Sequence, residues 1–140
     1  MQVVETHTPR PLPTVGGLIF NPEGKILLVR THKWADLLGT PGGKMEYGET
    51  MEEAFIREAK EETGLDIYDL KFVLIRDAIN HPQFYRPNHF ILINFTAQTY
   101  SSEVILNDEA YEYQWVGLEE SLLLDLNQPT RVLIETVMNL

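Results

Sequence analysis

The stretch of the sequence that most constrains its own structure is a helix from about Thr50 to Thr63. Thr50 followed three residues later by Glu53 forms a capping box, in which each side chain accepts a hydrogen bond from the backbone N–H of the other residue. Gly64 then supplies the left-handed conformation that commonly closes a helix. A fold for this chain must therefore place one well-defined helix in the middle of the sequence.

The residues on either side of this helix predict strands and two further helices. Before it, two strands are joined by a tight turn that contains Pro22 and Gly24, and residues 31–48 form mostly loop with short strand pieces. The expected segments are an extended lead-in at His7–Pro13, strands at Val15–Phe20, Lys25–Arg30, Leu70–Ala78, His89–Gln98 and Glu112–Val116, a short helix at Leu118–Leu124, and a last helix from Pro129 that buries Leu133, Ile134, Val137 and Met138. Strands interspersed with helices indicate one layered α/β or α+β domain over residues 1–140.

The composition excludes several kinds of chemistry. The chain has 140 residues, of which 44% are hydrophobic, and it contains no cysteine, so disulfides, thiolate catalysis and thiolate metal sites are excluded. Its formal net charge of −10 repels phosphate, so nucleic acid and acidic membranes are not expected partners. If such a protein handles a polyanion, a cation must stand between the two.

The sequence also bears on location. No apolar run approaches the roughly 20 residues of a membrane span, and the first residues lack a basic segment followed by an apolar one. We therefore expect a soluble, cytoplasmic protein without a membrane partner. A homodimer is neither required nor forbidden by the exposed aromatic residues.

The central helix carries an unusual acidic face. Met51 and Ala54 begin an apolar stripe, yet the stripe continues with Glu58, Glu61 and Glu62, which share one face of the helix. Three like charges so close together oppose folding unless a cation lies among them, and oxygen ligands select Mg²⁺ or Mn²⁺ over zinc. On these residues alone, a solvated acidic face is an equally good explanation.

The segment 43–65 as a whole resembles the Nudix box of the Nudix hydrolase family. Its fixed positions are all filled, by Gly43, Glu49, Arg57, Glu58, Glu61, Glu62 and Gly64, with Leu65 at the final aliphatic position. Only Ala59 is smaller than the aliphatic residue that is commoner there. With average residue usage, a chance match in a chain of this length is rarer than about one in a million.

The resemblance implies a fold, a cofactor and a set of roles. It implies a Nudix-type α/β/α sandwich with a mixed β-sheet, and an enzyme that uses Mg²⁺, with Mn²⁺ as an alternative. It further implies that Glu58 and Glu62 bind the metal, that Glu61 is a further ligand or holds a water on it, that the carbonyl of Gly43 joins the coordination sphere, that Arg57 orients the carboxylates by ion pairing, and that Glu49 supports them. Helical geometry separately directs Arg57 toward Glu53 and Glu61.

Family members commonly take a base or another metal ligand from a loop well past the box. Residues 107–112 contain three acids, and we rank Glu109 first, Glu112 second and Asp108 third. The alternative is that these acids only make an exposed loop soluble.

The residues expected to bind the substrate lie outside the box. Aromatic rings can stack on a base and a guanidinium can contact phosphate, which singles out the segment from Asn80 to His89. The candidate substrate contacts are Arg30, Tyr47, Phe84, Tyr85 and Arg86, with His32 and Lys33 as further phosphate candidates. A hairpin tip with a small aromatic cluster explains residues 80–89 about as well, and Trp34 fits either the wall of a pocket or half-buried packing.

The implied substrate is a small-molecule nucleotide, a nucleoside diphosphate linked to another group. Asp125-Leu126-Asn127 before Thr130-Arg131 is similar to the carboxy-terminal part of bacterial Nudix nucleoside triphosphate diphosphatases. This similarity favours cleavage of a nucleoside triphosphate to nucleoside monophosphate and pyrophosphate. Hydrolysis of ADP-ribose or another nucleotide sugar is the alternative, and a non-catalytic nucleotide sensor is a third, disfavoured because no carboxylate of the box is missing.

Overall fold

The structure is a computed structural model and describes residues 9–140, in which seven strands form one mixed sheet. The strands are β1 (Leu12–Phe20), β2 (Ile26–Arg30), β3 (Leu38–Gly39), β4 (Gly42–Lys44), β5 (Ile67–Ile79), β6 (His89–Thr99) and β7 (Glu112–Val116). The helices are α1 (Met51–Thr63), α2 (Leu118–Ser121) and α3 (Gln128–Met138), and a 3-10 turn spans His32–Trp34. The strand order is β3-β2-β1-β6-β5, with β4 paired to β1 and β7 paired to β2.

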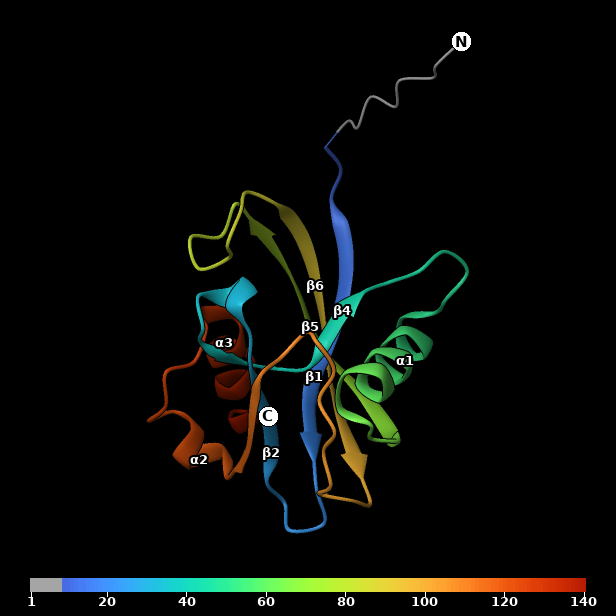
Figure 1. The fold of residues 1–140 in the computed structure, drawn as a ribbon, viewed down its shortest axis with the longest axis vertical. Helices are drawn as coiled ribbons and strands as arrows, with labels where there is room; N and C mark the ends of the chain where they lie inside the picture. Colours follow the sequence, from blue (N-terminus) through green and yellow to red (C-terminus); the bar gives the residue numbers. More distant parts are fainter. Residues whose placement is uncertain (1–8) are drawn as a thin grey trace.

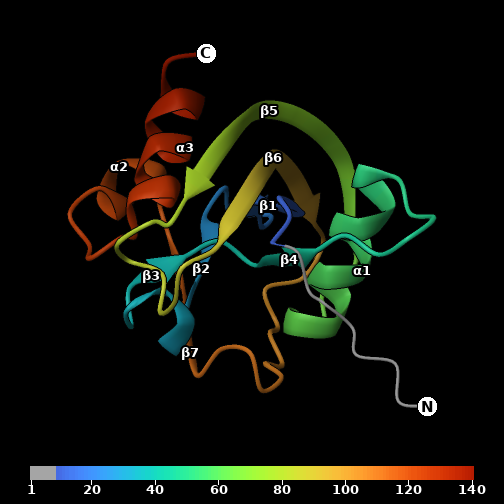
Figure 2. The same ribbon diagram turned by 90° about the horizontal axis from the view of Figure 1, so that it is seen from above.

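The sheet lies between two helical layers. Helix α1 covers one face, and α2 and α3 lie on the other (Figures 1 and 2). The strand β2 shows why both faces are covered, because Leu27 and Val29 pack in the core with α1 while Ile26 and Leu28 pack in the core with α3. Four consecutive apolar residues, from Ile26 to Val29, suit a strand in a sheet that is buried on both faces. The predicted α/β/α sandwich with a mixed sheet is thereby confirmed.

The two strands of the first hairpin, β1 and β2, separate beyond their turn. Strands β1 and β2 pair only near their turn, where Phe20 lies opposite Ile26. Beyond that point β1 runs parallel to β6 and pairs with β4, whereas β2 pairs with β3 and β7 (Figure 1). The two strands therefore separate, and residues from both of them line the cavity described below.

Most predicted boundaries agree with the structure, and three do not. Strand β1 begins at Leu12, inside the proline-containing lead-in, whose residues His7 and Thr8 lie outside the described part of the chain. Strand β5 begins at Ile67, three residues earlier than predicted, and two register shifts interrupt its pairing with β6. The short helix ends at Ser121 rather than at Leu124.

Met138, which the sequence predicts to be buried, is exposed instead, as is Met51, which begins the apolar stripe of the central helix. Met51 is the first residue of α1 and Met138 the last residue of α3. Positions at the end of a helix have fewer neighbours to cover them, which helical periodicity alone does not register. No helix within residues 9–140 combines the length and the apolar character that crossing a membrane requires.

Candidate active site

The two ends of α1 fix where its charged residues lie. The Thr50 hydroxyl accepts a hydrogen bond from the Glu53 N–H, and the Glu53 carboxylate accepts one from the Thr50 N–H, both at 3.1 Å. At the other end, Gly64 adopts a φ of 76° and its N–H donates to the Lys60 carbonyl. Both caps are those that the sequence predicts. They set where the helix begins and ends, and its apolar residues set which side faces the sheet.

The three glutamates of α1 differ strongly in exposure. Glu62 shares the sheet-facing side with Phe55 and Ala59, and it is only 6% exposed. The side chain of Glu58 is 17% exposed and that of Glu61 is 56% exposed. The acidic face is therefore not uniformly solvated, and one of its carboxylates belongs to the interior.

Arg57 gathers the carboxylates around its guanidinium group. Its Nε lies 2.6 Å from Glu49, and one terminal nitrogen lies 2.9 Å from Glu58 and 3.2 Å from Glu61. These bonds raise the pKa of Arg57 and lower the pKa of Glu49. The expected approach to Glu61 is present, whereas Glu53 is occupied by the helix cap.

The buried carboxylate of Glu62 has only partial compensation for its charge. It accepts one hydrogen bond from the Gly42 N–H at 2.8 Å. Burial raises its pKa from 4.5 to about 8, and the charges of Glu58 and Glu109 push in the same direction. The pKa of Glu58 is raised as well, chiefly by burial, although its bond to Arg57 opposes that shift.

Gly43 leaves the space that the Glu58 carboxylate occupies. A Cβ atom built at Gly43 would overlap the Glu58 carboxylate, so position 43 accepts no side chain unless that group moves. The backbone of β4 therefore runs directly against the acidic face of α1. This close approach brings the peptide group of residue 43 beside Glu58.

We expect Gly43→Ala to separate folding from activity. The added methyl group displaces a flexible carboxylate rather than the backbone, so the midpoint of thermal unfolding should stay within a few degrees of that of the wild type. Displacing a ligand by about 1 Å should lower turnover by roughly 100-fold. Circular dichroism and steady-state assays check both values, and full activity in a folded variant would contradict this reading of Gly43.

The donor set fits a hard divalent cation. Glu58, Glu62 and the carbonyl group of residue 43 offer only oxygen atoms, as Mg²⁺ and Mn²⁺ require. A carboxylate buried beside a second carboxylate also calls for positive charge. Within residues 9–140, no three His, Asp or Glu side chains converge as a metal-binding group. Glu61 bonds to Arg57 and Glu109 bonds to Lys33.

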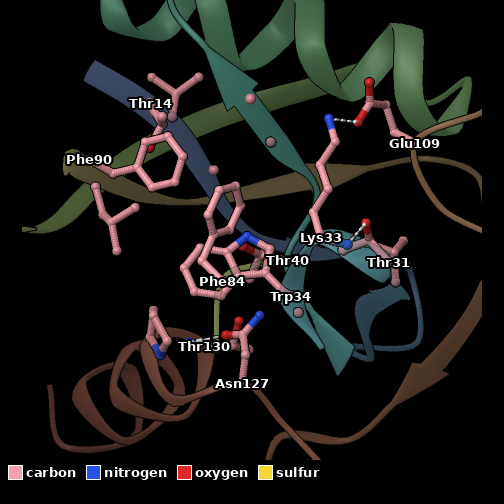
Figure 3. Close-up of a pocket in the computed structure, with 18 of the residues that line it drawn as sticks. Thr14, Thr31, Lys33, Trp34, Thr40, Phe84, Phe90, Glu109, Asn127 and Thr130 are labelled. Carbon is pink, nitrogen blue, oxygen red and sulfur yellow. Dashed lines mark hydrogen bonds and ion pairs between the residues drawn. The ribbon is translucent and has the colours of Figure 1, made fainter. Parts of the chain in front are cut away.

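A cavity of about 380 Å³ runs from these carboxylates to a cluster of aromatic rings. Glu58, Glu62 and Glu109 line one part of it, and Trp34, Phe84 and Phe90 line another. Figure 3 shows Lys33 reaching toward Glu109 on one side and Asn127 and Thr130 on the other. Acids and aromatic rings that lie far apart in the sequence thus share one concave site.

The aromatic cluster centres on Phe84. Its ring centroid lies 4.9 Å from that of Trp34 and 4.9 Å from that of Phe90, both in edge-to-face geometry. The loop that carries Phe84 closes the β5–β6 hairpin through a bond from the Asn80 N–H to the Asn88 carbonyl. This loop is therefore both a hairpin tip and a wall of the cavity, together with Tyr85 and Arg86.

Two predicted substrate contacts do not line the cavity. The Arg30 guanidinium is held by Glu112 at 2.9 Å and by Asp125 at 2.7 Å, outside the lining of the cavity. It ties β2 to β7 and to the segment before α3. Tyr47 is fully exposed in the loop between β4 and α1 and does not line the cavity either.

Of the three acids in residues 107–112, only Glu109 lines the cavity. Glu112 pairs with Arg30, and Asp108 is exposed outside the cavity. Glu109, the first choice from the sequence, is therefore the acid of this segment that reaches the cavity, and its role as a base or metal ligand stays a prediction.

Several polar residues of the cavity were not predicted. They are Thr14, Asn94, Asn127 and Thr130. Asn127 caps α3 by accepting from the Thr130 N–H at 2.9 Å, and Figure 3 shows its amide directed at the cavity. A signal existed for Asn94, because it interrupts an otherwise apolar run in β6. Such interruptions mark polar positions on a buried strand.

Comparison with known proteins agrees with this site. The family model described as NUDIX domain matches residues 10–137. Nucleoside triphosphatase NudI of Enterobacter sp. (strain 638) is 37% identical over 97 residues, covering 65% of this chain and 69% of that protein. ADP-ribose pyrophosphatase of Methanocaldococcus jannaschii is 36% identical over 110 residues, covering 77% of this chain and 63% of that protein.

The similarity extends to the whole fold. The crystal structure of the MutT protein from Methanosarcina mazei Go1 superposes with a TM-score of 0.78 at 27% identity, covering 96% of this chain and 97% of that one. The family match spans nearly all described residues, and Glu58 and Glu62 of the box line one cavity. The chain therefore belongs to the NUDIX domain family and is a Nudix hydrolase.

Proposed function

We propose that the protein hydrolyses a nucleoside triphosphate to a nucleoside monophosphate and pyrophosphate, with a divalent cation as cofactor. The observation that carries this function is the single cavity that joins the aromatic cluster of Trp34, Phe84 and Phe90 to Glu58 and Glu62. A base held among the rings places its phosphate chain toward the carboxylates.

The carboxylates of Glu58 and Glu62 and the carbonyl of Gly43 would hold Mg²⁺ or Mn²⁺. A bound ion of this kind offsets phosphate charge and eases removal of a proton from water. The net charge of −10 makes such a mediator necessary for binding a polyphosphate.

The side chains of the protein have distinct tasks in this reaction. Arg57 keeps Glu49, Glu58 and Glu61 in fixed orientations through its bidentate geometry. Glu109 faces the same cavity from the opposite loop and is our candidate for accepting a proton from the attacking water. Arg86 lies over the Tyr85 ring at the cavity wall, where it can contact phosphate.

The relatives support two substrate classes. The similarity to nucleoside triphosphatase NudI favours a triphosphate, and the similarity to an ADP-ribose pyrophosphatase favours a nucleotide sugar as the second candidate. The products separate the two, since a triphosphate yields pyrophosphate and ADP-ribose yields two monophosphates.

A panel of nucleoside triphosphates and nucleotide sugars, each with Mg²⁺ or Mn²⁺, tests this function. We expect turnover of at least one triphosphate, with release of pyrophosphate. Mass spectrometry in ¹⁸O-labelled water would show which phosphorus receives the water oxygen. Binding and thermal stabilisation by a nucleotide without any turnover would contradict hydrolysis and indicate a sensor.

A further inference from the structure

Lys33 lies at the edge of the cavity, in the 3-10 turn between β2 and β3. The turn is capped by Thr31, whose hydroxyl accepts from the Lys33 N–H at 3.2 Å. The Lys33 ammonium lies 3.0 Å from the Glu109 carboxylate, which is 76 residues away in the sequence (Figure 3). Both side chains line the cavity that holds Glu58 and Glu62.

The backbone on either side of Glu109 is fixed without help from Lys33. The Asn107 N–H donates to the Glu62 carbonyl at 3.3 Å, and the Tyr111 N–H donates to the Arg30 carbonyl at 3.0 Å. The direction of the Glu109 side chain is a separate matter, because it projects from the exposed middle of this loop and its ion pair is with Lys33.

The ion pair contributes little to folding. Both side chains are 51% exposed, and exposed ion pairs contribute about 0–1 kcal/mol to stability. Both partners line the cavity, so the pair places the Glu109 carboxylate at its edge. Removing the ion pair should therefore change catalysis without changing stability.

The turn that carries Lys33 also belongs to the aromatic wall. The Lys33 carbonyl accepts from the Tyr85 N–H at 2.8 Å, and the neighbouring Trp34 packs on Phe84. One turn of three residues thus contacts the loop of aromatic rings through its backbone and the acid through its side chain. A change in the conformation of this turn would therefore affect both the aromatic wall and the acidic side of the cavity.

We propose that Lys33 is a positioning residue that holds the Glu109 carboxylate at its place in the site. The effect of Lys33 on turnover rests on the proposed function, whereas its effect on the position of the loop around Glu109 does not. Lys33 acts through Glu109, and the two residues form one unit.

A double-mutant cycle tests this role. Lys33→Met should lower kcat by about 10-fold with KM changed by less than about threefold, and Lys33→Arg should restore most of the loss because a guanidinium can keep the pair. In a Glu109→Gln background, Lys33→Met should have no further effect. Lys60→Met is the matched control, because Lys60 pairs with Asp66 at 3.1 Å on an exposed surface outside the cavity.

Hydrogen exchange gives a readout that needs no substrate. In Lys33→Met the amides of residues 108–110, which lie between the two backbone bonds that do not involve Lys33, should exchange faster than in the wild type and in Lys60→Met, while the midpoint of thermal unfolding is unchanged. Unchanged exchange, unchanged kcat, or losses that multiply in the double variant would overturn the role of Lys33. If the wild type hydrolyses no nucleotide, the proposed function fails, and the exchange measurement alone decides the role of Lys33.

Discussion

Replacing Glu62 by glutamine should nearly abolish turnover while leaving the fold intact. The amide keeps the shape of the side chain and can still accept the bond from the Gly42 N–H, but it lacks the charge that holds a divalent cation. We expect kcat to fall by about 100- to 1,000-fold or more. Steady-state assays at saturating Mg²⁺ measure this loss, with Glu135→Gln on the exposed side of α3 as the matched control.

The same variant should be at least as stable as the wild type when no metal is present. Burial raises the pKa of Glu62 from 4.5 to about 8, so the folded state holds this proton more tightly than the unfolded state does. The contribution of Glu62 to stability is therefore fully present below about pH 4.5 and is lost as the pH rises through about 8. Glutamine does not titrate, so Glu62→Gln should not lose this stability as the pH rises.

Thermal unfolding measured with a chelator present, at pH 6 and at pH 8.5, tests this difference between the wild type and Glu62→Gln. The wild type should lose more stability between the two pH values than Glu62→Gln does, and added Mg²⁺ should stabilise the wild type but not the variant. A variant that is unfolded even at low temperature would contradict the assignment of Glu62. So would a variant that Mg²⁺ still stabilises as strongly as the wild type.

Replacing Arg57 by methionine should have the second largest effect, and this one should reach stability as well. The guanidinium is the shared counterion of Glu49, Glu58 and Glu61, and it is mostly buried. Removing it leaves two mostly buried carboxylates unpaired, at a cost of about 2–4 kcal/mol in unfolding free energy. Turnover should fall by about 10- to 100-fold, because the ligands lose their orientation.

Lysine at position 57 should restore only part of both losses. Its ammonium supplies the charge but cannot form the fork that binds Glu49 with two nitrogens. Mg²⁺ should recover some stability in Arg57→Met, since the cation offsets the same carboxylates. Urea unfolding with and without Mg²⁺ checks this, with the exposed Arg10→Met as control, and equal stability of Arg57→Met and the control would refute the shared-counterion role.

Local sequence signals predicted the central helix well. Thr50, Glu53 and Gly64 act within a few residues of one another, so their spacing is enough to place both ends of α1. The acidic side of the helix followed from the same periodicity. What periodicity could not give was the difference in burial between Glu61 and Glu62, which depends on where the sheet meets the helix.

Contacts between distant segments were beyond the sequence. Arg30 has the chemistry of a phosphate ligand, yet its partners Glu112 and Asp125 lie 82 and 95 residues away. Lys33 next to it reaches the cavity, and nothing in the local pattern distinguishes the two. Tyr47 precedes Gly48 in an exposed loop, so an aromatic residue close to the box in sequence lies outside the cavity in space.

The most direct test of the central claim is anomalous diffraction from crystals grown with Mn²⁺ and a triphosphate analogue whose α and β phosphorus atoms are bridged by methylene. We predict anomalous peaks within coordination distance of Glu58, Glu62 and the Gly43 carbonyl, with the base among Trp34, Phe84 and Phe90. Peaks only at other carboxylates, or a nucleotide bound outside this cavity, would contradict it.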